Sequence, residues 1–244
     1  MKIVIDTHTH SIASGHAYST VQELAKGAYE KGIEAFAMTD HGPAMKGAPH
    51  IYHFGNLRVI PELIGGVRIV KGAESNIIDF KGSIDIPSDY IDRLEFLLAS
   101  FHDICIKPGT VEEHTEALCG ALKNTHIDAI AHPGNPQYPI DIDRVVKAAA
   151  ELGKLIEINN SSFTVRTGSA PNCAEIVRKC KKYGTRITCG SDAHISFDVG
   201  RFDYVKRLLE DEKFPEELLI GSSMERFLAY LEERKSRIGQ AGQL

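Results

Sequence analysis

Short apolar runs alternate with amphipathic segments along this chain of 244 residues. The apolar runs, rich in Ile, Ala, Val and Leu, predict strands at residues 3–8, 35–40, 68–74, 96–102, 129–132, 155–160 and 186–192. Segments with helical periodicity predict helices at residues 21–32, near 56–65, 110–124, 141–153, 172–184, near 201–211 and near 223–236. Because helices separate nearly all of the strands, we expect an α/β fold with parallel strands and right-handed crossovers.

Two arrangements fit this alternation, a closed barrel and an open doubly wound sheet. No G-x-G-x-x-G loop follows the first strand, which weighs against a dinucleotide-binding fold. In a parallel barrel the active site gathers at the carboxyl ends of the strands. Polar residues at those ends are therefore the first candidates for chemistry.

Composition is that of an ordinary soluble protein, with 43% hydrophobic and 25% charged residues. The net charge of -5 argues mildly against a surface for long nucleic acids, so we regard a nucleic-acid partner as disfavoured. Nothing approaches 18 consecutive apolar residues, and we expect no membrane partner. The first strand already contains Asp6 and lacks the features of a secretory signal, so we expect a cytoplasmic protein.

The five cysteines are an odd number, and no two of them form a C-x-x-C pair. This pattern disfavours a disulfide framework and a thiolate zinc site. We interpret the cysteines as small apolar residues in a reducing compartment.

Histidines concentrate where the predicted strands end. Of 11 histidines in the chain, six stand directly at these ends, namely His8, His10, His41, His102, His132 and His194. His16 follows in the loop after the first strand, and the carboxylates Glu74 and Asp192 occupy two further strand ends. Since residues two apart in a strand point the same way, H-x-H and D-x-H pairs can each grip one ion. Imidazole with carboxylate suits Zn²⁺, Mn²⁺ or Fe²⁺, so the sequence predicts a metal centre.

The remaining histidines have other interpretations. His114 and His126 lie on or at the end of a predicted helix and are expected to be structural. His50 and His53 lie in a loop after the second strand, where contact with substrate and a purely structural place are equally plausible. Asp6 could fix the tautomer of a ligating histidine or cap the strand loop.

A family resemblance joins these motifs. D-T-H-T-H, T-D-H-G, G-A-E-S-N, A-S-F-H, A-H-P-G-N-P, E-I-N-N-S-S-F and G-S-D-A-H together resemble the PHP superfamily, named for polymerase and histidinol phosphatase. H-A-Y-S-T, T-D-H-G-P and H-P-G-N-P resemble most closely the YcdX-like branch of bacterial metal-dependent phosphatases. The resemblance runs from Asp6 to about residue 230, and many separate motifs occur in the right order.

The resemblance implies a distorted seven-stranded parallel (β/α) barrel, like a TIM barrel, that forms a single PHP domain over residues 1–244. It also implies a trinuclear site. The first ion would be held by His8, His10, Glu74 and Asp192; the second by Glu74, His102 and His132; and the third by His16, His41 and His194. Zinc is the metal we expect first, with manganese or iron as alternatives.

We therefore expect a phosphatase that hydrolyses a small phosphate monoester by in-line attack of a metal-bound hydroxide. The residues expected to take part in catalysis are Asp192, Glu74 and His194, and those expected to bind substrate are Arg166, His50 and His53. An arginine suits this role because its guanidinium can hold a phosphate through two hydrogen bonds.

Other functions fit part of the pattern. A metal-dependent amidohydrolase would use a similar barrel, but no lysine stands at a strand end where it could be carbamylated; Lys71 lies within its strand. A nuclease-like phosphodiesterase is disfavoured by the acidic balance. A non-catalytic metal-binding module would carry the metals without turnover. The natural substrate, the metal and the oligomeric state stay open at this point.

Overall fold

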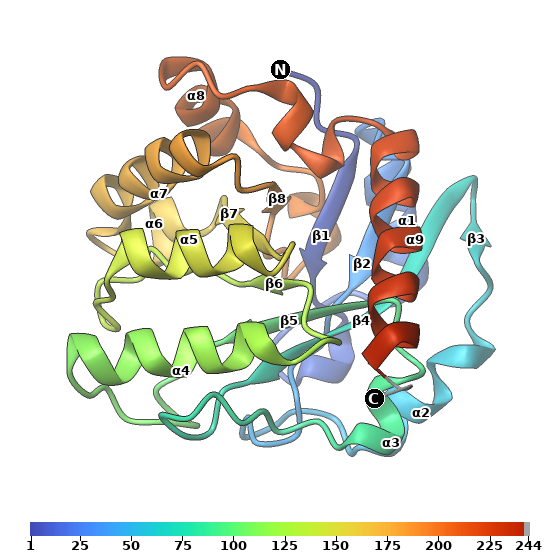
Figure 1. Cartoon of the computed structure of the whole chain (residues 1–244). Helices are drawn as coiled ribbons and strands as arrows, with labels where there is room; N and C mark the ends of the chain where they lie inside the picture. The colour runs from blue at the N-terminus through green and yellow to red at the C-terminus, as the bar shows by residue number, and fades with distance from the viewer. Residues whose placement is uncertain (242–244) are drawn as a thin grey trace.

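A computed structural model describes residues 1–241. Its centre is a sheet in which seven parallel strands follow the order β1-β2-β4-β5-β6-β7-β8 and curl into a nearly closed barrel. The chain therefore adopts the barrel alternative, and the expected α/β class is confirmed. Figure 1 shows the strands at the centre with α4 (Val111–Lys123), α5 (Ile142–Glu151) and α7 (Ser169–Tyr183) stacked along one side.

All seven predicted strands are present. They are β1 (Ile5–Thr9), β2 (Ala35–Met38), β4 (Val67–Asn76), β5 (Phe96–Ser100), β6 (Ala129–Ile130), β7 (Leu155–Asn159) and β8 (Ile187–Gly190). Six of the predicted helices are also found, as α1 (Val21–Glu30), α4, α5, α7, α8 (Asp203–Asp211) and α9 (Met224–Ala241). Most strands end earlier than predicted, so several of the candidate residues lie in the loops that follow.

The segment predicted as a helix near 56–65 is different. The helical part, α2 (Tyr52–Asn56) followed by η2 (Leu57–Val59), ends before residue 60. The chain then forms β3 (Leu63–Ile64), which pairs antiparallel with β4. Gly65 and Gly66 connect these strands with φ of 58° and 86°. A two-residue turn with both φ values positive is the preferred hairpin connection, so the Gly-Gly pair overrides the helical pattern.

The remaining short helices of residues 1–241 are η1 (Ile12–Ser14), α3 (Ser88–Ile91), α6 (Ser162–Val165), η3 (Ser196–Asp198), η4 (Glu216–Leu218) and η5 (Ile220–Ser222). The two edge strands approach each other where they end. His10 N donates to Ala193 O at 2.8 Å, and Asp192 N donates to His8 O at 2.8 Å. These bonds join the loop after β8 to the end of β1, which brings the first and last histidine motifs together.

Two apolar clusters lie on the two faces of the sheet, as expected when consecutive strand residues point in opposite directions. In β5, Leu97 and Ala99 belong to the cluster beneath the outer helices, whereas Phe96 and Leu98 belong to the other cluster. That second cluster is completed by Phe227 and Tyr230 of α9, the helix drawn in red to the right of β1 in Figure 1.

Helix α9 is held to the barrel by a buried ion pair. Asp128 accepts a hydrogen bond from Arg234 Nε at 2.7 Å and another from Tyr230 Oη at 2.9 Å. Asp128 Oδ1, which accepts from Tyr230, also accepts a hydrogen bond from Arg237 Nη2 at 3.1 Å. Among residues 1–241, no helix has both the length and the apolar character that a membrane crossing requires.

Candidate metal centre

The nine residues proposed as metal ligands lie together at the carboxyl ends of the strands. Neighbouring imidazole rings have centroids 4.3 Å apart for His10 and His41, 4.3 Å for His10 and His194, 4.8 Å for His16 and His194, and 5.5 Å for His102 and His132. Three groups of side chains have ligand atoms that converge within 4.8 Å of one another: His10, His41 and His194; His8, His10 and Glu74; and His41, Glu74 and His102.

Glu74 lies at the middle of this cluster, and its two oxygens face different histidines. Oε1 lies 2.8 Å from His132 Nε2 and 3.4 Å from His102 Nε2. Oε2 lies 2.7 Å from His41 Nδ1 and 3.3 Å from His8 Nε2. A carboxylate with one oxygen toward each group has the arrangement needed to bridge two cations.

Several contacts in the cluster suit a cation held between the atoms. His8 Nε2 and His10 Nε2 are 3.1 Å apart, and so are His194 Nε2 and His16 Nε2. Glu74 Oε2 and His41 Nδ1 are buried and lack a partner of hydrogen-bonding geometry. Unpaired buried polar atoms are costly, and convergent imidazole nitrogens with a carboxylate are a donor set for Zn²⁺, Mn²⁺ or Fe²⁺. The residues therefore fit the metals that the sequence predicts.

The electrostatics suit metal ligation. Burial, together with the neighbouring His41, lowers the pKa of His10 to about 3. Burial and the charge of Arg166 lower the pKa of His132 to about 4. A ligating imidazole must be neutral, so both rings are ready to bind a cation at pH 7. Burial raises the pKa of Glu74, but the neighbouring histidines, led by His8, outweigh it and hold that pKa well below its usual range.

Two of the proposed ligands have unusual backbone conformations. His132 has a φ of 35° and Asp192 a φ of 58°, which is the left-handed region that residues with a side chain seldom occupy. Such conformations concentrate at functional sites, where the surrounding structure must hold them. Here His8 O accepts the hydrogen bond of Asp192 N, so β1 supports the conformation of the loop after β8.

Polar residues that the sequence analysis did not single out hold the rings in place. Ser14 Oγ lies 3.1 Å from His10 Nδ1, and Asn76 Oδ1 lies 2.7 Å from His102 Nδ1. Each contact leaves Nε2 of the ring to face the centre of the cluster. Partners of this kind commonly fix the tautomer and orientation of a ligating histidine. A third such partner, Glu157, meets His8 Nδ1 at 2.7 Å.

Asp6, within β1, and Asp40, just after β2, have different surroundings. Asp6 accepts hydrogen bonds from the backbone nitrogens of Ser191 and Gly200 at 2.9 and 2.7 Å, so it caps loops. Asp40 accepts hydrogen bonds from the hydroxyls of Ser11 and Ser14, both at 2.7 Å. Through Ser14, Asp40 is linked to the ring of His10.

The three proposed substrate-binding residues lie in different places. Arg166 Nη2 donates to Asp192 Oδ2 at 3.1 Å, which puts the guanidinium directly beside a proposed metal ligand. His53 Nε2 contacts Asp40 Oδ2 at 3.1 Å and is partly buried. His50 is exposed, and its Nδ1 accepts a hydrogen bond from Tyr52 N at 3.2 Å. Of the three, only Arg166 touches one of the nine proposed ligands.

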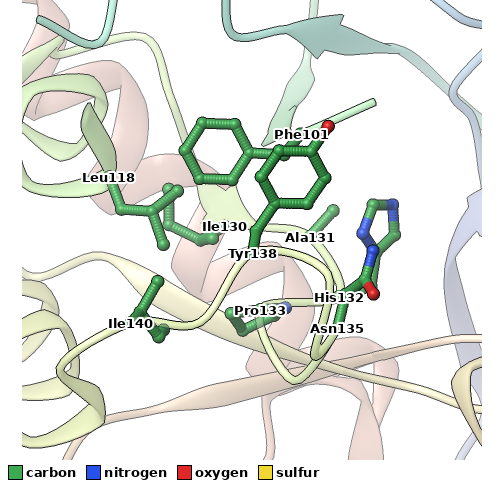
Figure 2. A pocket seen from close by; sticks show the side chains of 9 residues that line it. All are labelled: Phe101, Leu118, Ile130, Ala131, His132, Pro133, Asn135, Tyr138 and Ile140. Carbon is green, nitrogen blue, oxygen red and sulfur yellow. The ribbon is translucent and has the colours of Figure 1, made fainter. Parts of the chain in front are cut away.

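Two cavities border the cluster. Figure 2 shows the smaller one, in which the stacked rings of Phe101 and Tyr138 lie above apolar side chains, with His132 at its edge. It has only about 10 Å³ of free space, which is roughly the room for one water molecule. A second, open cleft of about 410 Å³ lies beside His102 and Arg166, and its volume is in the range of small-molecule sites.

Comparison with known sequences gives the family. The PHP domain matches residues 6–161, which include most of the proposed ligands. The chain belongs to the PHP family. A probable phosphatase of Acetivibrio thermocellus is 65% identical to this PHP protein over 238 residues, covering 98% of this chain and 99% of the relative. A probable phosphatase of Caldanaerobacter subterraneus subsp. tengcongensis is 55% identical over 241 residues, covering 98% of this chain and 95% of the relative.

Solved structures share the fold of this PHP protein. Histidinol phosphate phosphatase from Lactococcus lactis, in complex with zinc, L-histidinol and phosphate, superposes with a TM-score of 0.61 at 19% identity. The match covers 88% of this chain and 95% of that chain. A chain in the structure of archaeal ribonuclease P with mature tRNA also has a TM-score of 0.61, at 13% identity, over 95% of this chain and 91% of that chain. At these identities the similarity concerns the fold alone.

Proposed function

We propose that this PHP protein is a metal-dependent phosphatase that hydrolyses a small phosphate monoester at a trinuclear centre. The observation that carries the proposal is the convergence of imidazole nitrogens on the buried Glu74, whose pKa is held well below its usual range. The naming of close relatives as probable phosphatases supports the same reaction class. We further propose that the described chain works as one domain, because its two apolar clusters share a single sheet.

Three sets of residues would hold the ions. They are His8, His10, Glu74 and Asp192; Glu74, His102 and His132; and His16, His41 and His194, with zinc as the first choice and manganese or iron as alternatives. Bound divalent ions supply Lewis acidity, which activates water near neutral pH and stabilises charge on phosphate oxygens. The two oxygens of Glu74, which contact different histidines, support its role as the bridge.

The chain's own residues would bind and orient the ester. Arg166 has a guanidinium with five donors. Nη2 donates to Asp192 Oδ2 at 3.1 Å, and Nη1 makes longer contacts of 3.4 Å with Asn159 Oδ1 and Ser162 Oγ. Its remaining donors can hold phosphate oxygens, while Asp192 keeps the guanidinium in place. His194, whose side chain is 31% exposed, lies at the rim of the cluster beside the more exposed His16, so its ring could exchange protons with solvent.

The open cleft beside His102 and Arg166 would receive the alcohol part of the ester. Its exposed lining includes Asp103 and Gln137, so a polar leaving group would be accommodated. A cleft of about 410 Å³ suits a small metabolite better than a polymer. This size supports a monoester over the nuclease alternative.

A substrate panel tests the proposal. Purified protein is assayed with p-nitrophenyl phosphate, bis(p-nitrophenyl) phosphate and p-nitrophenyl acetate, each with saturating Zn²⁺ or Mn²⁺. We expect the monoester to be hydrolysed fastest and Glu74→Gln to abolish that activity, because the amide cannot replace the bridging charge. Preference for the diester or the acetate, or full activity of Glu74→Gln, would contradict the proposal.

A further inference from the structure

Glu157 is a buried carboxylate with no part in the proposed ligand sets. It lies in β7, is 1% exposed, and stands out among the apolar residues of that strand. Buried carboxylates are uncommon unless their oxygens are satisfied by specific partners. The partners of Glu157 therefore indicate what it is for.

Each oxygen of Glu157 holds a different proposed ligand. Oε1 lies 2.7 Å from His8 Nδ1. Oε2 accepts a hydrogen bond from the backbone nitrogen of His132 at 2.7 Å and a longer one from Asn159 Nδ2 at 3.3 Å. His8 belongs to the first proposed ligand set and His132 to the second, so one carboxylate connects the two.

The contact with His8 determines which ring nitrogen is available. When Nδ1 donates its proton to the carboxylate, the lone pair of the neutral ring is on Nε2. Nε2 of His8 is the atom that faces His10 Nε2 at 3.1 Å and Glu74 Oε2 at 3.3 Å. Glu157 thus directs the ligating atom of His8 toward the centre of the cluster.

The contact with His132 holds a strained backbone. The φ of 35° at His132 is unfavourable for a residue with a side chain. Since the charged acceptor strengthens the hydrogen bond from His132 N, it helps to keep this conformation. The ring of His132 then meets Glu74 Oε1 at 2.8 Å.

Gly190 in β8 leaves the space that this arrangement needs. A Cβ atom at residue 190 would overlap Glu157 Oε1 and His8 Cβ, although the φ of Gly190 is not in the left-handed region. The absence of a side chain at residue 190 therefore makes room for the carboxylate of Glu157 and for His8. The arrangement joins residues of β1, β7 and β8 with His132, which follows β6.

We propose that Glu157 is a positioning residue, which fixes the tautomer of His8 and the backbone of His132 and so couples the first two metal subsites. This inference rests on the proposed metal-dependent function. It assigns no metal contact to Glu157 itself. It requires that loss of the carboxylate weaken those two subsites more than the third, which is formed by His16, His41 and His194.

The test is Zn²⁺ binding by metal-free protein in competition with a chromophoric chelator. For Glu157→Ala we expect the ions of the first two subsites to bind about 10- to 100-fold more weakly, as is typical when a partner of a ligating histidine is lost. The remaining ion should bind as in the wild type. The Zn²⁺ affinity of Glu157→Gln at the first two subsites should lie between those of the wild type and Glu157→Ala. Its carbonyl oxygen can accept from His8 Nδ1, but its amide group cannot accept from His132 N.

Asp128→Asn is the matched control, since Asp128 is also a fully buried carboxylate but contacts none of the proposed ligands. It should lower the melting temperature without changing Zn²⁺ affinity, and circular dichroism reports whether each variant is folded. Wild-type affinity for all ions in both Glu157 variants would overturn the inference, and so would a uniform weakening of all ions. If the wild type itself bound no Zn²⁺, the proposed function would fail instead.

Discussion

Replacing Arg166 by alanine tests the proposed phosphate site. The side chain is only 17% exposed and lies against Asp192, so its guanidinium is held in a fixed position. A hydrogen bond to a charged group contributes about 1.5–3 kcal/mol, which corresponds to roughly 10- to 150-fold in kcat/KM. We expect Arg166→Ala to show a loss of this size with p-nitrophenyl phosphate, mainly as a higher KM, because the contact is present before the reaction begins.

Two control variants separate the phosphate contact from other effects. Arg166→Lys keeps the charge but not the planar pair of donors, so its KM should lie between wild type and Arg166→Ala. Arg201, exposed and paired with Asp198 at 3.1 Å, can be replaced by alanine without effect. Metals are counted in every sample, since freeing Asp192 could also release an ion. A KM of Arg166→Ala within twofold of the wild type would remove the residue from the site.

Three further predictions concern stability, the first two measured by urea unfolding and the third by thermal unfolding. Arg234→Met should lower the free energy of unfolding by about 3 kcal/mol, because it removes one partner of the buried charge of Asp128. A decrease below about 1 kcal/mol would refute this prediction. Burial, with nearby Arg237, lowers the pKa of Lys154 to about 7. Between pH 7 and about 10 the lysine of the unfolded chain therefore keeps a proton that the folded protein has released. The free energy of unfolding should rise with pH over this range. Lys154→Met should remove this rise while exposed Lys147→Met keeps it; equal slopes would show that the three carbonyl oxygens around Lys154 Nζ hold it charged. Removal of bound metal by chelator should lower the melting temperature, and re-addition of Zn²⁺ should restore it.

The strand-end histidines could be predicted because their placement follows from topology. Parallel strands with alternating helices put all carboxyl ends on one side, so His8, His102 and His132 had to be neighbours once the strands were identified. The same reasoning placed Glu74 and Asp192 beside them. The regular parts of the fold were predictable for the same reason, since each strand and each long helix has its own periodic pattern.

What could not be predicted depends on contacts between distant segments. Glu157 is a single charged residue in an apolar strand, and its two partners are revealed only by the fold, which brings β1 and the loop after β6 close to its side chain. Its spacing of two residues before Asn159 was the one signal available, since both side chains face the same side. The left-handed backbone of His132 leaves no trace in the sequence. The helix predicted near 56–65 ends early because Gly65 and Gly66, both with positive φ, form a tight hairpin turn.

The central claim is that the histidine cluster holds the metals on which phosphatase activity depends. The most direct measurement counts metals per chain by plasma mass spectrometry and assays the same sample on p-nitrophenyl phosphate, with and without chelator. We expect about two to three ions per chain, and phosphate release that chelator abolishes and added metal restores. Less than about one ion per chain after reconstitution, or phosphate release that chelator leaves unchanged, would contradict it.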